Sequence, residues 1–231
     1  MQKRDYLIIL VVVLMAPLWA QTGFENRPIT NNVNMPTAST LNKGEFQLGI
    51  GPLAFGISDK VQIGTNVLEF IFGSANANLR VNVLNTADNA VAVGIGVGQT
   101  ETTLYGRDVS YVAWYPFVAY SRPLSPTTLF HASLNLSAFT GDEDVQNADP
   151  RAFWRGTSID AGVEYSYSNK TMFLGEAGYD FTFDGPRLSG AVLWGWKTFR
   201  LKLGLAVYNP AGNANAFVSP LLGLWWRFGG N

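Results

Sequence analysis

From Gly44 onward the sequence alternates apolar residues with polar or small ones at a period of two, almost to its end. Successive side chains of a β-strand point to opposite faces, so this period is that of strands with one apolar and one polar face. The alternation recurs in eleven segments, near residues 46–57, 61–67, 78–83, 91–98, 111–121, 133–137, 158–165, 173–181, 189–196, 200–207 and 221–228. After the first residues, no segment has the i, i+3, i+4 spacing of an amphipathic helix. The chain is therefore predicted to be all-β.

The connections between these segments are sorted by length. Short ones fall near residues 58–60, 85–89, 123–126, 168–170 and 197–199, and longer ones near 69–76, 101–108, 140–154, 182–186 and 209–216. Tight turns at one end and long loops at the other are typical of bacterial outer-membrane barrels. In a bilayer, a sheet must close into a barrel so that every backbone N–H and C=O group at its edges is hydrogen-bonded. The predicted fold is a closed antiparallel up-and-down transmembrane β-barrel over residues 44–231.

The strand number needs one further decision. Bacterial single-chain barrels have an even number of strands, and the alternation supplies eleven. Val33–Leu41 could add a weak first strand before a turn at residues 42–44, although Pro36 lacks the N–H that a ladder requires. Twelve strands are predicted, with ten as the alternative.

The first twenty residues have the successive regions of a secretory signal peptide: a positive start, an apolar middle and a small-residue end. Lys3 and Arg4 precede an apolar run over residues 6–15, and Ala20 ends a region of smaller residues. Cleavage after Ala20 is predicted, and a single N-terminal anchor helix is the alternative. Residues 21–43 are polar and rich in Asn and Pro. They are expected to form an extended segment that packs weakly.

Alternation alone does not show whether the apolar face points into a core, as in a lipocalin-like barrel, or outward to lipid. Two features of the strands favour lipid outside. The polar face mixes charges of both signs with many glycines, which suits a narrow, watery, ion-paired lumen better than an exterior in water. Aromatic residues such as Trp114, Tyr179 and Trp194 lie near strand ends, where the girdles of membrane barrels sit.

The last strand adds a third feature. Leu222, Leu224, Trp226 and Phe228 share one of its faces, and only residues 229–231 follow. This strand resembles the C-terminal insertion signal of Gram-negative outer-membrane β-barrels, in which the aromatic residue is usually the last. The resemblance implies export, recognition by the barrel-assembly machinery, and a place in the lipid bilayer of the outer membrane.

A second resemblance lies near the start of the predicted barrel. Residues 34–38 (NMPTA), 40–46 (TLNKGEF) and 55–59 (FGISD) resemble the opening of uncharacterised transporter-like outer-membrane proteins, some labelled after phenol-degradation pathways. These motifs are short, and they imply a porin-like fold and location rather than a substrate.

The charged residues on the polar faces are the candidates for lining the lumen. They are Arg80, His131, Asp160, Glu164, Glu176, Asp180, Arg200 and Lys202. The four carboxylates are expected to form one acidic wall, and Arg200 and Lys202 to reach across the lumen as a basic wall. Such walls would set ion selectivity in an open lumen or fill a plugged one with ion pairs.

Composition excludes several other classes. Only 14% of the 231 residues are charged, the net charge is −1 and there is no basic cluster, so no nucleic-acid partner is predicted. There is no cysteine, which excludes disulfides and thiolate metal sites. Asp142, Glu143, Asp144 and Asp149 share one loop, but their spacing is not that of a calcium loop. No metal and no cofactor are predicted.

Three functions remain open. The first, which we predict, is a narrow channel or transporter for a small solute. The second is a structural or interaction barrel with a plugged lumen and ligand-binding outer loops. The third is an outer-membrane hydrolase in which His131 acts as base toward Ser133. A hydrogen-bonded lumen histidine is the simpler interpretation of His131, so we expect no enzyme.

Overall fold

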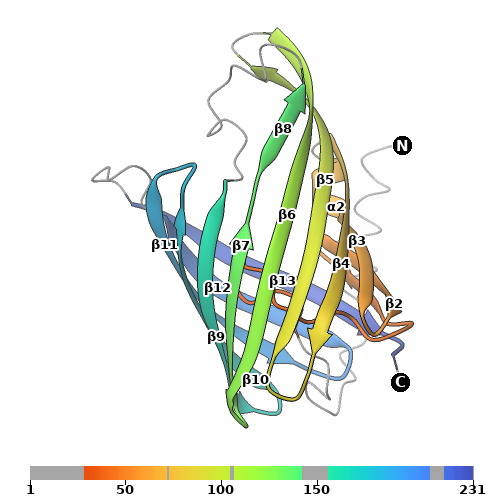
Figure 1. The fold of residues 1–231 in the computed structure, drawn as a ribbon, viewed down its shortest axis with the longest axis vertical. Coiled ribbons are helices and arrows are strands. Elements are labelled where there is room, and N and C mark those ends of the chain that lie inside the picture. Colours follow the sequence, from red (N-terminus) through yellow and green to blue (C-terminus); the bar gives the residue numbers. More distant parts are fainter. Residues whose placement is uncertain (1–28, 72, 105–106, 142–155, 209–215, 231) are drawn as a thin grey trace.

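The computed structural model describes residues 29–71, 73–104, 107–141, 156–208 and 216–230, and it forms one antiparallel sheet (Figure 1). The strands share an apolar outer face, and a five-residue helix follows the third of them. The elements are β1 Phe46–Gly49, β2 Pro52–Ser58, β3 Val61–Asn66, α2 Val67–Ile71, β4 Ser74–Asn85, β5 Ala90–Leu104, β6 Arg107–Ser125, β7 Thr128–Asn135, β8 Ala138–Gly141, β9 Ser158–Ser168, β10 Thr171–Asp180, β11 Gly185–Gly195, β12 Phe199–Tyr208 and β13 Phe217–Phe228.

The sheet closes on itself. Consecutive strands pair from β1 to β7 and from β9 to β13, β7 pairs with β9, and β1 pairs with β13, where Phe46 is opposite Phe228. The short strand β8 pairs with β6 above β7 and lies outside the ring. Twelve of the thirteen strands therefore form the closed barrel, which confirms the predicted fold and strand number.

The twelfth strand is not the one that the sequence suggested. The segment 46–57 is split into β1 and β2 by a turn at Ile50 and Gly51. Gly51 has φ +107°, a conformation that other residues rarely adopt, and Pro52 then begins β2. Val33–Leu41 was the wrong choice, because these residues lie inside the barrel and not in its wall.

The five short turns that the sequence predicted, after β2, β4, β6, β9 and β11, lie at the end of the barrel that also holds Phe46 and Phe228. The longer loop expected at residues 101–108, at the opposite end, is mostly strand, because β5 runs to Leu104 and β6 begins at Arg107, and a two-residue turn between β1 and β2 also lies at that opposite end. The wall is uneven in length, since β1, β2 and β3 have 4, 7 and 6 residues whereas β6 has 19. Figure 1 shows β5 and β6 rising above the other strands. The side of the barrel made by β1–β3 is therefore its low side.

The outer face of the barrel is apolar and its inner face largely polar. Leu222 is 66% exposed and Leu203 43%, whereas Glu164, Glu176 and Arg200 are buried. A soluble barrel has the opposite distribution, and a closed strand ring with an apolar exterior is what a bilayer requires. The chain is accordingly an outer-membrane β-barrel. The one helix in the described residues, α2, is too short to cross a membrane.

The lumen is filled by the chain's own N-terminal part. Ile29, Val33, Met35, Ala38 and Leu41 are all buried, and their contacts are with the inner wall. The expectation that this segment packs weakly is wrong for residues 29–43. The predicted signal peptide, residues 1–20, and residues 21–28 lie outside the described part of the chain.

Candidate functional site

Residues 29–41, here called the plug, run back on themselves inside the barrel. Asn31 and Pro36 form an isolated bridge, the Asn32 N–H donates to the Met35 carbonyl at 3.0 Å, and the Thr37 N–H donates to the Thr30 carbonyl at 3.0 Å. Pro36 has no N–H to satisfy, which suits this irregular backbone. Most of the plug's other polar backbone groups need partners from the wall, because buried N–H and C=O groups are rarely left unpaired.

The tip of the plug is bound by two charged side chains. Glu176 Oε2 accepts the N–H groups of Asn34 at 2.8 Å and Met35 at 2.9 Å. On the other side, Lys202 Nζ donates to the carbonyls of Asn32 at 3.1 Å and Val33 at 2.6 Å. The two side chains come from the wall strands β10 and β12, and both bind backbone rather than side chains.

Arg80 of β4 binds the two arms of the plug together. Its Nη1 donates to the Thr30 carbonyl at 2.5 Å and to the Ser39 carbonyl at 2.9 Å, and its Nη2 donates to Asn31 Oδ1 at 3.0 Å. The guanidinium also lies 5.2 Å from the centre of the Phe117 ring. A buried cation is thus matched by carbonyl dipoles of the plug.

Neutral side chains bind the plug nearer the turn end of the barrel. Asn82 Nδ2 donates to the Ala38 carbonyl at 2.8 Å, and the Ala38 N–H donates to Ser121 Oγ at 2.9 Å. The Leu41 N–H donates to Gln62 Oε1 at 3.0 Å. Just below, Glu45 and Arg227 form a buried two-bond ion pair, 2.7 Å at each bond, between the plug's exit and the last strand.

The plug also has a small apolar contact with the wall. Ile29 and Val33 pack with Met172, Leu174 and Leu193 on the inner faces of β10 and β11. The sequence interpretation of a watery lumen missed this patch. The signal was present, because Met172 and Leu174 share a strand face with Glu176 by the period of two.

One wall glycine makes room for the plug. A Cβ on Gly162 would lie 2.9 Å from Met35 Sδ and would also meet the amide of Asn32. Any larger residue there would push the plug away from β9. The glycines of the inner face thus fit a filled lumen as well as they would fit a narrow open one.

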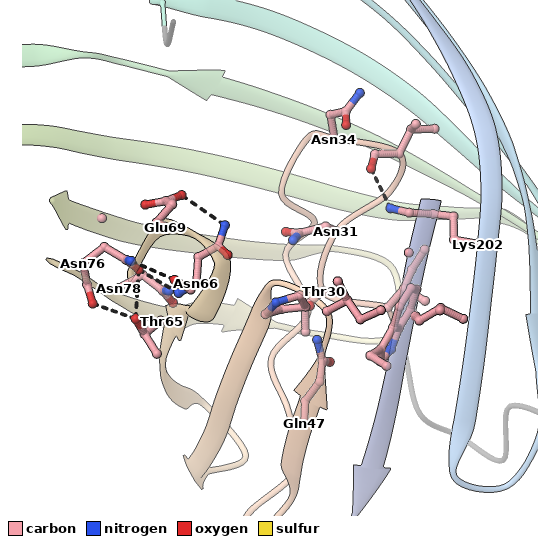
Figure 2. A pocket seen from close by; sticks show the side chains of 18 of the residues that line it. Thr30, Asn31, Asn34, Gln47, Thr65, Asn66, Glu69, Asn76, Asn78 and Lys202 are labelled. Atoms are coloured by element: carbon pink, nitrogen blue, oxygen red, sulfur yellow. Dashed lines mark hydrogen bonds between the residues drawn. The ribbon is translucent and has the colours of Figure 1, made fainter. Parts of the chain in front are cut away.

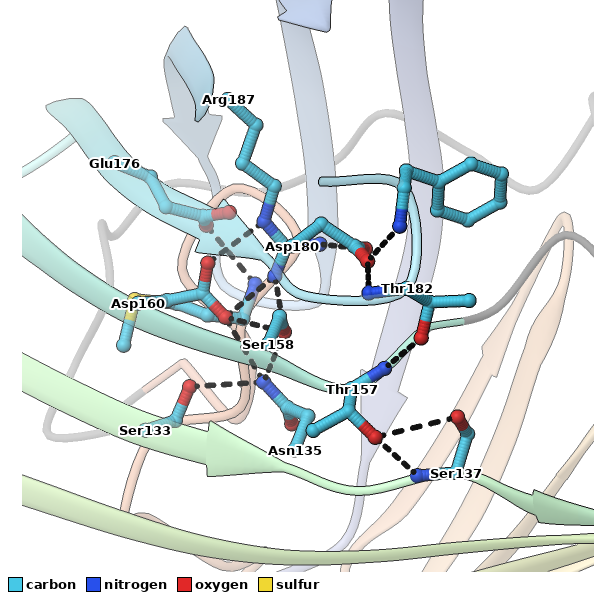
Figure 3. A network of polar contacts seen from close by, with 12 residues as sticks. Ser133, Asn135, Ser137, Thr157, Ser158, Asp160, Glu176, Asp180, Thr182 and Arg187 are labelled. Atoms are coloured by element: carbon cyan, nitrogen blue, oxygen red, sulfur yellow. Dashed lines mark hydrogen bonds and ion pairs between the residues drawn. The ribbon is translucent and has the colours of Figure 1, made fainter. Parts of the chain in front are cut away.

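The eight residues predicted to line the lumen are buried or half-buried, but their contacts differ. Arg80, Glu176 and Lys202 bind the plug, as described above. Asp160 pairs with Arg187, whose Nε donates to Oδ1 at 2.7 Å, and it also accepts Asn135 Nδ2 at 2.9 Å (Figure 3). Asp180 Oδ1 accepts the N–H groups of Thr182 and Phe183 at 3.0 and 3.1 Å, in the β10–β11 turn.

The four carboxylates lie on the inner faces of the neighbouring strands β9 and β10, as expected, but they are not directly opposite one another: Glu176 is opposite Gly162 and Glu164 opposite Leu174. The expected pairing with a basic wall across the lumen differs, because Asp160 pairs with Arg187 of β11, two strands along the same wall. Arg200 donates to the carbonyls of Trp196 and Phe199 in its own turn.

His131 has a different serine partner from the one predicted. Its Nδ1 lies 2.8 Å from Ser121 Oγ, and its Nε2 lies 3.5 Å from Glu164 Oε2. Ser133 instead accepts Asn135 Nδ2 at 3.2 Å. A serine, a histidine and a carboxylate in a row resemble a catalytic arrangement. Here, however, Ser121 Oγ already accepts the Ala38 N–H, and the plug covers it where a substrate carbonyl would have to lie.

A cavity of about 400 Å³ lies above the plug, on the low side of the barrel (Figure 2). Its lining combines plug residues with amides from β3 and β4 and one ammonium group. The polar members include Thr30, Asn31, Asn34, Asn66, Asn76, Asn78 and Lys202. Such a lining suits a small ligand that accepts and donates hydrogen bonds.

Comparison with known proteins gives no family. No family model matches the chain, and no curated protein matches it. Among solved structures, a KdgM porin in complex with disordered oligogalacturonate has TM-score 0.48 and 8% identity over 81% of this chain and 97% of its own. The outer-membrane OmpT of Vibrio cholerae has TM-score 0.41 and 13% identity over 77% and 63%. A further KdgM porin has TM-score 0.34 and 9% identity over 80% and 97%. At such low scores these likenesses decide nothing about function.

Metal binding has no support in the described residues, where no group of three or more possible ligands was found. The acidic loop with Asp142, Glu143, Asp144 and Asp149 lies outside the described part of the chain. The site that remains is the plug, the side chains that hold it, and the cavity above it.

Proposed function

We propose that this protein is an outer-membrane channel for a small solute, and that the plug is its gate. The observation that carries the proposal is the way in which the plug is held. Most of the hydrogen bonds between plug and wall join plug backbone groups to wall side chains, and water can replace these on release. The cavity above the plug would hold the solute before passage. Export by the signal peptide and insertion by the barrel-assembly machinery belong to the same proposal.

A permanently plugged barrel that binds a partner through its outer loops is the second candidate. The apolar contact of Ile29 and Val33 with β10 and β11 favours it, because water does not replace apolar packing. Catalysis is not part of either candidate; with the plug docked, the Ala38 N–H binds Ser121 Oγ.

A disulfide lock separates the two candidates. The chain has no cysteine, so an engineered pair is the sole source of thiols. Ala38→Cys with Ser121→Cys joins the plug to β6 at a contact of 2.9 Å between Ala38 N and Ser121 Oγ. Solute flux is measured by swelling of proteoliposomes in small neutral sugars, and ion flux by conductance in planar bilayers.

For a gated channel, the oxidised pair should abolish flux, and reduction should restore it to the level of the Ala38→Cys single variant. Deletion of residues 29–41 should raise conductance well above wild type. Equal flux in the oxidised and reduced pair would refute gating by the plug. An absence of flux in wild type and in both forms of the pair would favour the permanently plugged barrel.

A further inference from the structure

The low side of the barrel is too short to cross a bilayer with strands alone. β1 has 4 residues, or about 13 Å at roughly 3.4 Å per residue. A strand that spans the hydrocarbon core needs about 9–11 residues, more than β2 and β3 have. Above β3 the chain continues as α2, whose Leu68, Phe70 and Ile71 are exposed apolar side chains. The upper half of the wall is therefore incomplete on this side.

The ladder between β3 and β4 ends early. Its last paired residues are Gly64 and Asn78. Beyond them, the side chain of Asn76 takes the place of a strand neighbour. Asn76 Oδ1 accepts the Asn66 N–H at 2.7 Å and the Thr65 hydroxyl at 2.9 Å, and Asn76 Nδ2 donates to the Asn66 carbonyl at 2.9 Å. Thr65, Asn66, Asn76 and Ala77 are here called the seam.

The seam separates two hollows of opposite character. Inside lies the amide-rich cavity above the plug. Outside lies an apolar groove of about 570 Å³ on the lipid face, lined by residues such as Phe55, Ile63 and Leu79. Thr65, Ala77, Asn78 and Val97 line both hollows. At this place the barrel wall is sealed by side chains and not by a backbone ladder: by the Asn76 amide, and by the Thr65 hydroxyl, which also donates to the Asn76 backbone carbonyl at 2.7 Å.

We propose that the seam is a lateral opening, through which a small amphipathic molecule passes between the cavity and the bilayer. The apolar part of the molecule lies in the outer groove, and its hydrogen-bonding head is bound by Asn66, Asn78 and the Lys202 ammonium. Lys202 Nζ now binds two plug carbonyls, and it lies 5.9 Å from the centre of the Trp225 ring. An acidic or hydroxylated head would suit this end of the cavity.

The seam can open at small cost because two side chains, those of Asn76 and Thr65, close it. Displacing them breaks bonds that the head group of the ligand can replace, whereas opening a paired ladder would break many backbone bonds at once. The inference rests on the barrel and the cavity of the proposed function, but it does not require the plug to move.

Two disulfide staples test the seam. The β3–β4 register, continued by one residue, sets Thr65 opposite Ala77 on the outer face, so Thr65→Cys with Ala77→Cys closes the seam and leaves Asn76 intact. Ile63→Cys with Leu79→Cys is the matched control, because this pair is on the same face within the ladder. Uptake is measured in nanodiscs whose lipid carries a dansyl-labelled fatty acid, by tryptophan-sensitised dansyl emission that an excess of unlabelled fatty acid displaces.

Oxidation of the seam pair should slow displaceable uptake at least tenfold, and reduction should restore it. The oxidised control pair should behave as wild type. The oxidised Ala38→Cys, Ser121→Cys lock should leave uptake unchanged while it blocks sugar flux. The proposal that the plug is a gate and the proposal that the seam opens can therefore be refuted independently. Equal uptake by the oxidised and reduced seam pair, or no displaceable uptake in wild type, would overturn the lateral opening.

Discussion

Glu176→Gln is the substitution that tests most directly how the plug is held. The carboxylate accepts two plug N–H groups through one oxygen, at 2.8 and 2.9 Å. Hydrogen bonds to a charged group contribute about 1.5–3 kcal/mol each, and neutral ones about 0.5–1.5 kcal/mol. A glutamine can still accept both bonds, so the loss is about 1 kcal/mol per bond, or about 2 kcal/mol in all. Undocking of the plug tip should therefore rise roughly 30-fold.

Hydrogen exchange of the plug amides measures this change. The backbone amides of Asn34 and Met35 should exchange roughly 30-fold faster in Glu176→Gln than in wild type, while amides of the β10 ladder keep their protection. Asp180→Asn is the matched control. Asp180 is on the same strand, and its carboxylate also accepts two backbone N–H groups, but these belong to the β10–β11 turn and not to the plug. Unchanged exchange at Asn34 in Glu176→Gln, or equal acceleration in both variants, would refute the assigned role of Glu176.

Three further predictions concern the wall. Phe228→Ala should lower the yield of heat-modifiable folded barrel on gels, because it removes the aromatic residue of the predicted insertion signal and the pair with Phe46; a wild-type yield would speak against that signal. Leu203→Arg should destabilise the barrel by about 2–4 kcal/mol in urea titrations if it lies near the bilayer midplane, and Leu203→Ile should not. Gly162→Ala should speed proteolysis of the plug, because its Cβ would meet Met35, whereas Gly175→Ala, whose Cβ would meet nothing within 4 Å, should leave proteolysis unchanged.

The barrel could be predicted from the sequence because its signal is local and repeated. A period of two assigns side chains to faces without any knowledge of pairing, and eleven repeats of it leave few alternatives. The twelfth strand was harder to find. The outward apolar residues are even-numbered in β1 (Phe46, Leu48) and odd-numbered in β2 (Leu53, Phe55, Ile57), so the alternation changes phase at the turn. This single change of phase, beside Gly51 and Pro52, was the signal of the extra hairpin.

The site could be predicted only in part. The faces of Glu176 and Lys202 follow from the alternation, but their partners do not, because periodicity says nothing of the register between neighbouring strands. A shift of two residues in register would set Glu176 opposite Asp160 or Glu164 instead of Gly162. The plug itself was misread for another reason. An irregular Asn- and Pro-rich segment has the composition of a loop, and its backbone is satisfied by residues that lie 21 to 170 positions away.

The way in which the plug is bound also indicates where its release can be controlled. Neutral bonds such as those of Asn82 and Ser121 contribute little net free energy, because water takes their place in a flooded lumen. Burial of Ile29 and Val33 contributes about 1.5–3 kcal/mol for each side chain, and water does not replace it. The charged bonds of Glu176 complete the resistance to release. Lys202 also binds the plug backbone and lines the cavity, so a solute that competes for Lys202 would shift the plug equilibrium far more than one that competes for Asn82.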